Sequence, residues 1–73
     1  MSGKVHKKVE LVGSSDKSIE DALQNAVNFA SQTLRHLDWF EVTQVRGNIM
    51  NGKIDTYQVT FNVGFRMEGS ETR

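Results

Sequence analysis

The stretch Met50-Asn51-Gly52-Lys53 lies between two long segments in which apolar and polar residues alternate. An Asn-Gly pair between alternating segments is the strongest short-range signal for a β-hairpin with a type I′ turn. If Asn51 and Gly52 form the loop, Met50 pairs with Lys53, and all the other cross-strand pairs follow from that one. The sequence therefore predicts a long hairpin in the second half of the chain.

The two faces of this hairpin differ in chemistry. One face pairs apolar residues, Phe40 with Val63 and Val42 with Phe61, and the alternation adds Val59, Phe65 and Met67. The other face pairs Trp39 with Gly64, Glu41 with Asn62, Thr43 with Thr60, and Val45 with Gln58. We expect the apolar face to pack on a helix, so the only tryptophan points away from the core.

A helix is predicted just before the hairpin. Ser18 followed by Asp21 resembles a capping box, and Ser15 offers a second cap one turn earlier. Apolar residues then recur at steps of three and four, which predicts a helix to about His36 or Leu37, through Ile19, Ala22, Leu23, Ala26, Ala30, Thr33, Leu34 and Leu37. This single stripe, with alanines at its centre, is typical of a helix that lies close to a sheet.

The expected order of elements is strand, helix, strand, strand. Alternation over Val5–Val12 predicts the first strand, with Val9 and Leu11 facing inward. A right-handed crossover to the second strand leaves room for the third strand between them. The prediction is an α+β fold in which a three-stranded antiparallel sheet, ordered 1-3-2, partly wraps one long helix. Residues 1–73 form one domain, with residues 1–3 and 69–73 expected to be flexible.

Size and composition favour self-association. A chain of 73 residues buries only a small core, and small domains compensate with disulfides, a structural metal or oligomerisation. The chain has no cysteine, and its two histidines lack metal-ligand spacing. One helix also leaves the second face of the sheet uncovered, so we expect an oligomer.

Charge and hydropathy narrow the classes of function. Nine Lys/Arg balance nine Asp/Glu for a formal net charge of zero, whereas nucleic-acid binders normally carry a basic surplus. No apolar run approaches a membrane span, and the N-terminus lacks the apolar core of a signal peptide. We expect a cytoplasmic protein with neither a nucleic-acid nor a membrane partner.

Trp39 is the first candidate binding residue. Gly64 opposite it leaves room for a close approach by a ligand, and the Gln58 carboxamide on the same face both donates and accepts hydrogen bonds. An indole with these neighbours suits a planar heterocycle. The alternative is that Trp39 packs in a subunit interface, where tryptophan is enriched. The two interpretations are compatible if the ligand lies at that interface.

Several motifs together resemble the dodecin family. The resemblance runs from about Lys4 to Glu68 and rests on Lys7–Ser15, Ala22–Arg35, Leu37–Val42, Arg46-Gly47, Tyr57-Gln58-Val59 and Val63–Arg66. It implies a flavin-binding protein assembled as a hollow homododecamer of 23 symmetry. It also implies that flavin pairs stack between symmetry-related tryptophans.

The resemblance assigns residues to the flavin. Trp39 matches the stacking residue, and Gln58 matches the glutamine that hydrogen-bonds the isoalloxazine edge. Arg46 matches an arginine of bacterial members and points to FMN, with riboflavin or FAD as alternatives. Asp38 and Gln44 flank the pocket by family position. The simple hairpin register, however, places Arg46 on the apolar face, so either a bulge at Gly47 re-aims it or it reaches around the end of the sheet.

A coenzyme A site is a second implication. Some bacterial members carry coenzyme A at three-fold contacts, and His6, Arg35 and Arg66 match the basic positions involved. Bacterial members often have an aromatic residue where this chain has His6. The alternative for Arg35 is a favourable cation at the helix C-terminus, and His36 needs no role beyond hydrogen bonding there.

No catalytic residue and no metal ligand is predicted. No nucleophile lies beside a base, and the helix dipole explains the pair Glu20-Asp21. A flavin stacked on both faces has no access to a substrate. We therefore expect a non-catalytic FMN-binding protein for storage, sequestration and photoprotective quenching. The alternatives are a minor flavin-dependent reductase or redox carrier, and a module that stacks nucleotides or RNA.

Overall fold

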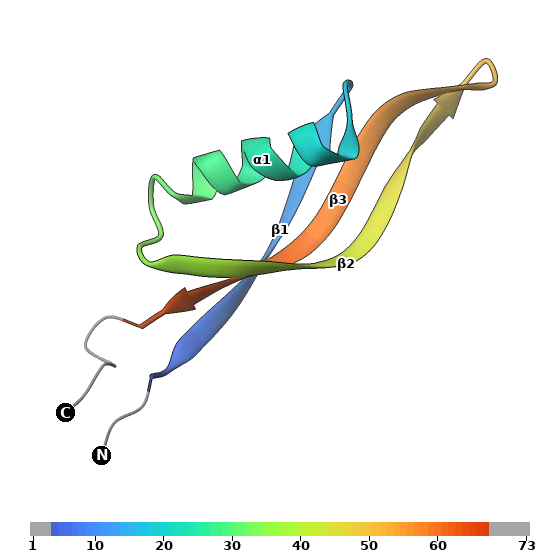
Figure 1. Cartoon of the computed structure of the whole chain (residues 1–73). Coiled ribbons are helices and arrows are strands. Elements are labelled where there is room, and N and C mark those ends of the chain that lie inside the picture. The colour runs from blue at the N-terminus through green and yellow to red at the C-terminus, as the bar shows by residue number, and fades with distance from the viewer. Residues whose placement is uncertain (1–3, 68–73) are drawn as a thin grey trace.

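The computed structural model describes residues 4–67, which form one sheet with a single helix on one face (Figure 1). The elements in chain order are β1 (His6–Ser15), α1 (Ile19–Ala30), β2 (Leu37–Met50) and β3 (Lys53–Arg66). All pairings are antiparallel and the strand order is β1-β3-β2. The predicted topology is confirmed, whereas the two ends expected to be flexible lie outside the described residues.

The hairpin turn has the predicted conformation. Asn51 and Gly52 have positive φ angles, 53° and 76°, as both central residues of a type I′ turn require. Met50 pairs with Lys53, so the hairpin begins in the predicted register.

The helix begins as predicted and ends earlier. The Ser18 hydroxyl accepts the Asp21 backbone N–H at 3.0 Å, which makes Ser18 the N-cap. Ser15 supports this cap, since its hydroxyl donates to Asp21 Oδ2 at 2.6 Å. The helix ends at Ala30, short of the expected His36 or Leu37.

Local hydrogen bonds explain the early end of α1. The Ser31 hydroxyl donates to the Asn28 carbonyl at 2.8 Å, and the Gln32 backbone N–H bonds to the Phe29 carbonyl, three residues back, at 3.2 Å. Such bonds tighten the last turn and satisfy carbonyls that a longer helix would use. His36, with φ 62°, then turns the chain into β2. Apolar residues at a spacing of three and four therefore continue beyond the end of the helix, although the chain there is no longer helical.

The core lies between α1 and the helix-facing side of β1 and β3. Its buried residues are Ala22, Ala30, Val59, Phe61 and Val63. Gly13 of β1 lets the helix approach closely, because a Cβ at this position would collide with the Ala22 carbonyl oxygen. Among residues 4–67, these five are the buried apolar residues, a small core of the size expected for so short a chain.

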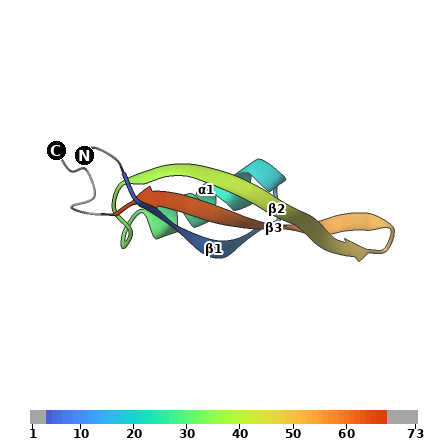
Figure 2. The same cartoon turned by 90° about the horizontal axis from the view of Figure 1, so that it is seen from below.

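The helix covers only part of the sheet. Its 12 residues span about 18 Å, whereas the 14-residue strands of the hairpin span about 46 Å. The far end of the hairpin extends beyond α1 (Figure 2). On the helix-facing side of β2, Phe40, Val42 and Val45 remain 54%, 41% and 51% exposed. The helix is therefore shorter than the one predicted to run to about His36 or Leu37, and β2 presents an uncovered apolar row.

Bulges change the register in the middle of the hairpin. The predicted pairs Phe40–Val63 and Val42–Phe61 are present. Thr43 and Asp55 have no cross-strand partner, so the segment between these two bulges shifts by one residue and pairs Gln44 with Thr60, Val45 with Val59, and Arg46 with Gln58. The predicted pairs Thr43–Thr60 and Val45–Gln58 are therefore wrong. The Thr43 hydroxyl instead donates to the Thr60 carbonyl at 3.2 Å.

Candidate ligand-binding site

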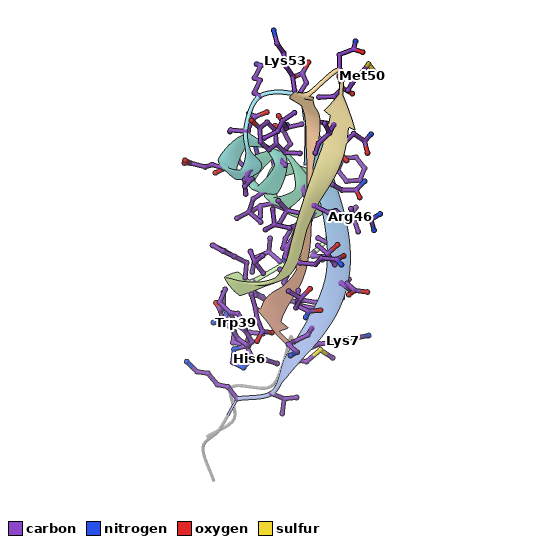
Figure 3. The ribbon with its side chains drawn as sticks, turned by 90° about the vertical axis from the view of Figure 1, so that its right-hand side faces the viewer. His6, Lys7, Trp39, Arg46, Met50 and Lys53 are labelled. Atoms are coloured by element: carbon purple, nitrogen blue, oxygen red, sulfur yellow. The ribbon has the colours of Figure 1, made fainter. Side chains whose placement is uncertain are left out.

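The sheet face opposite α1, called the outer face below, carries most of the residues predicted to bind the flavin. A one-residue shift in register turns a strand's side chains to the other face, so the bulges bring Gln44 and Arg46 onto the outer face beside Thr60 and Gln58. Arg46 projects on the side of the sheet away from the helix (Figure 3). The conflict over Arg46 is resolved by the bulges at Thr43 and Asp55, and not by a bulge at Gly47.

The indole of Trp39, a residue of β2, lies over the neighbouring strand β3. It pairs with Gly64 as predicted, and a Cβ at Gly64 would collide with the indole atoms Cδ2, Cε2 and Cζ2. The indole therefore rests directly on the Gly64 backbone, and Trp39 stays 41% exposed. The expectation of open space above Gly64 is wrong, because the tryptophan's own ring fills that space.

His6 and Asp38 lie beside the indole. The His6 and Trp39 ring centroids are 5.0 Å apart with the planes tilted by 53°, and His6 Nε2 lies 2.8 Å from Asp38 Oδ2. Sequence reasoning placed Asp38 at the flavin and His6 at a coenzyme A site, and it missed that the two side chains contact each other. The strand order 1-3-2 contained a signal, since His6 on β1 and Trp39 on β2 share the outer face across β3.

Gln58 and Arg46 line a separate pocket on the outer face. Its volume is about 110 Å³, and its other lining residues are Ser14, Gly47, Asn48, Thr56 and Tyr57. These hydroxyl, amide and guanidinium groups suit a polar ligand edge or an anionic group. The positions of Gly64 and Gln58 are separated along β3 by about 20 Å, so one chain does not bring Trp39 and Gln58 together.

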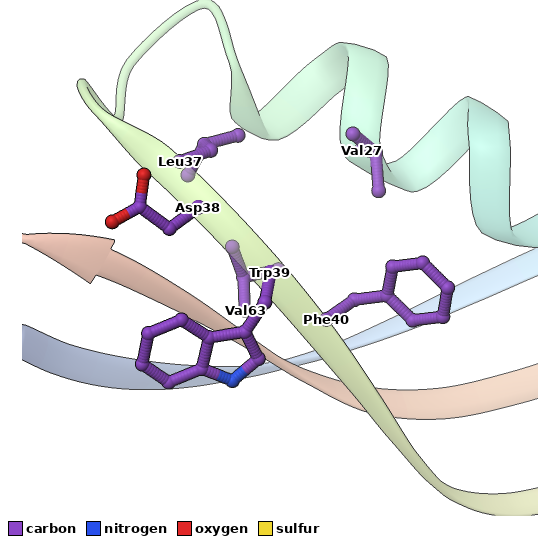
Figure 4. Close-up of a pocket in the computed structure, with 6 residues that line it drawn as sticks. All are labelled: Val27, Leu37, Asp38, Trp39, Phe40 and Val63. Carbon is purple, nitrogen blue, oxygen red and sulfur yellow. The ribbon is translucent and has the colours of Figure 1, made fainter.

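A second pocket lies between α1 and β2 (Figure 4). It has a volume of about 150 Å³, and its lining is largely apolar: Val27, Leu37, Asp38, Trp39, Phe40 and Val63. The Trp39 indole and the Phe40 ring leave β2 in different directions. Phe40 thus belongs to the uncovered apolar row, while the indole belongs to the outer face.

The residues predicted for coenzyme A are only partly together. Arg35 and Arg66 line one pocket of about 230 Å³ with His36, and Arg66 Nη2 lies 3.1 Å from His36 Nδ1. His6 does not line this pocket. Arg35 lies beyond the end of α1 at Ala30, and the last helical turn contains no basic residue, so the helix-dipole explanation for Arg35 is wrong.

Two further findings concern residues 4–67 alone. Within this range no three His, Cys, Asp or Glu side chains lie close enough to hold a metal ion together. The same residues contain no helix with the length and hydropathy needed to cross a bilayer.

Comparison with known proteins assigns the family. The family model described as Dodecin matches residues 5–68. The dodecin of Thermus thermophilus is 56% identical over 66 residues, which cover 90% of this chain and 96% of that protein. A crystal structure of a Thermus thermophilus protein matches with a TM-score of 0.86 and 56% identity, covering 90% of this chain and 97% of that one. The structure of dodecin from Streptomyces coelicolor matches with a TM-score of 0.86 and 51% identity, covering 96% of this chain and all of that one (100%). The chain belongs to the dodecin family.

Proposed function

We propose that this protein stores and sequesters FMN without catalysing a reaction, in a homododecamer where Trp39 forms one wall of each flavin site. The observation that carries the proposal is the position of the indole on Gly64. One face of the ring lies against the β3 backbone, and Trp39 stays 41% exposed. An aromatic surface fixed in this way favours stacking of a planar ring from the outside.

The separation of Trp39 from Gln58 supports a site shared between copies of the chain. Gly64, beneath the indole of Trp39, and Gln58 lie about 20 Å apart along β3, farther than a three-ring isoalloxazine reaches. A ligand that stacks on Trp39 and hydrogen-bonds Gln58 therefore needs the second residue from a neighbouring copy. A two-fold axis supplies this arrangement twice, since each copy contributes both residues.

Uncovered apolar surface supports the assembly. Phe40, Val42 and Val45 form a half-exposed row on the helix-facing side of β2, and β2 is an edge strand of the sheet. A monomer would leave both features in water, at a cost in stability and with a risk of aggregation. A homododecamer of 23 symmetry, as in the family resemblance, removes this surface from water.

The pocket around Arg46 favours FMN over riboflavin. Arg46 lies opposite Gln58 on the outer face, and both line the same polar pocket. Gln58 suits the hydrogen-bonding edge of a flavin, and a guanidinium suits its phosphate. Gln44, one pair further along the same face, is placed to contact the same ligand.

The geometry also favours sequestration over catalysis. A flavin with Trp39 on one face and a second flavin on the other has no room for a substrate. The indole can donate an electron to the photoexcited flavin, and the return of that electron leaves both unchanged, which is the proposed route of photoprotective quenching. A cytoplasmic location fits this role. The coenzyme A site predicted at His6, Arg35 and Arg66 stays a prediction; Arg35 and Arg66 line one pocket, whereas His6 contacts Trp39 and Asp38.

A fluorescence titration tests the proposal. Purified protein is added to FMN and the flavin emission is followed, with Trp39→Ala as the test variant and Glu10→Gln on β1 as the control. We expect strong quenching by the wild type and the control, and bright flavin with Trp39→Ala. Equal quenching by Trp39→Ala would refute stacking on the indole. Oxidation of NADPH above the rate given by free flavin would favour the reductase alternative.

A further inference from the structure

Three side chains from two edge strands meet over the central strand at one end of the outer face. His6 comes from β1, Asp38 and Trp39 come from β2, and Gly64 of β3 lies beneath the indole. The His6 ring lies 5.0 Å from the indole, and its Nε2 lies 2.8 Å from Asp38 Oδ2. The cluster therefore joins the two edge strands across β3, and Figure 3 shows His6 and Trp39 at the same end of the sheet.

A bulge brings Asp38 into this cluster. Leu37 pairs with Phe65 and Trp39 pairs with Gly64, so Asp38 has no cross-strand partner. A bulge re-aims the side chain of its extra residue, and here the Asp38 carboxylate reaches the imidazole of the far edge strand. An ionised carboxylate only accepts hydrogen bonds, so Nε2 of His6 is the donor.

We propose that His6 is a positioning residue for Trp39, and that Asp38 acts on the flavin site through His6 instead of contacting the flavin. This inference rests on the proposed stacking role of Trp39. The Gly64 backbone limits motion of the indole toward the sheet, and the imidazole limits its motion along the outer face.

The hydrogen bond to Asp38 holds the imidazole of His6 in place. The side chains of His6 and Asp38 are 27% and 40% exposed to solvent, so burial alone does not hold either of them in place. The hydrogen bond between the two side chains restricts the motion of both. The contact between the imidazole and indole rings in turn restricts the motion of Trp39. A stacking surface that is ordered before binding loses less entropy when the ligand arrives, which raises affinity without any new contact.

Two readouts test the proposal, and one of them needs no flavin. The near-ultraviolet circular dichroism of the ligand-free protein reports how rigidly the single tryptophan is held. We expect this tryptophan signal to weaken in His6→Ala and in Asp38→Ala, and to persist in Asp38→Asn, which keeps an acceptor for Nε2. Glu10→Gln on β1 is the control and should leave the signal unchanged. Light scattering and thermal unfolding confirm that each variant still assembles.

FMN titration then separates positioning from direct contact. We expect His6→Ala and Asp38→Ala each to weaken FMN binding about tenfold, and the double variant to be no weaker than either alone, because the two act as a unit. Asp38→Asn should bind nearly as well as the wild type.

Other results would overturn the proposal. If Asp38→Ala weakens FMN binding while His6→Ala does not, Asp38 contacts the flavin directly. If neither variant changes the tryptophan signal or the affinity, the cluster does not position the indole. If the wild type fails to bind FMN, the proposed function fails, whereas the tryptophan signal still decides whether His6 holds Trp39.

Discussion

Replacing Gly64 by alanine tests whether the indole of Trp39 lies where the structure places it. A methyl group at this position would collide with three ring atoms of Trp39, so the indole must leave the β3 backbone. Overpacking of this kind costs about 1–3 kcal/mol. We therefore expect Gly64→Ala to lower the free energy of unfolding by that amount and to weaken FMN binding.

When the indole is absent, we expect Gly64→Ala to have the opposite effect on the free energy of unfolding, because of the backbone conformation at Gly64. Gly64 is not among the described residues with positive φ, so alanine adopts its conformation without strain. Gly→Ala substitutions at such positions stabilise by about 0.4–1 kcal/mol, because they restrict the unfolded chain. In the Trp39→Ala background, Gly64→Ala should therefore be neutral or stabilising.

Urea unfolding of the four ligand-free proteins completes this double-mutant cycle. All four are measured at one protomer concentration, because the stability of an oligomer depends on concentration. The expected coupling between the two positions is at least 1 kcal/mol. If Gly64→Ala destabilises both backgrounds equally, the collision is with something other than the indole, and the stacking argument loses its structural basis.

Three further predictions concern the ligand, the assembly and the core. Arg46→Gln should weaken FMN binding about tenfold and leave riboflavin binding unchanged, as parallel fluorescence titrations will measure; equal losses for both flavins would contradict a phosphate contact. Val42→Lys, in the uncovered apolar row, should convert the oligomer to smaller species in light scattering, whereas Gln24→Lys on the exposed side of α1 should have less effect; an intact oligomer would place the interface elsewhere. Phe61→Ala should cost about 3–5 kcal/mol in urea unfolding because Phe61 is fully buried, and a loss below 1 kcal/mol would show that the core repacks around the cavity.

The topology was predictable because its signals are local. The Asn51-Gly52 turn fixed where the hairpin reverses, and Ser18 with Asp21 fixed where the helix begins. The end of the helix was not predictable from the spacing of apolar residues, since Thr33, Leu34 and Leu37 continue the steps of three and four. Competition from the Ser31 hydroxyl and the tightened turn after Phe29 ended the helix instead.

The bulges left a signal in the sequence that a simple alternation ignores. Phe40 and Val42 are at even positions on the apolar face, but the next apolar residue of the strand is Val45, at an odd position. This change of phase is what one extra residue at Thr43 produces. The cluster of His6, Asp38 and Trp39 was harder to predict, because it depends on side-chain directions across three strands and on a further bulge at Asp38.

The paired bulges explain how one edge strand serves two purposes. Without them, Arg46 would face the helix side of β2 and Val45 would face outward, so the strand would bury a charge and expose an apolar residue on the binding face. With them, Val45 joins Phe40 and Val42 in the row available for assembly, while Gln44 and Arg46 join Gln58 on the outer face. The second bulge, at Asp55, is what limits the shift to this middle segment, so the turn at Asn51-Gly52 keeps its own register. Assembly and ligand binding thus depend on the same few residues, and a deletion at Thr43 should impair both together.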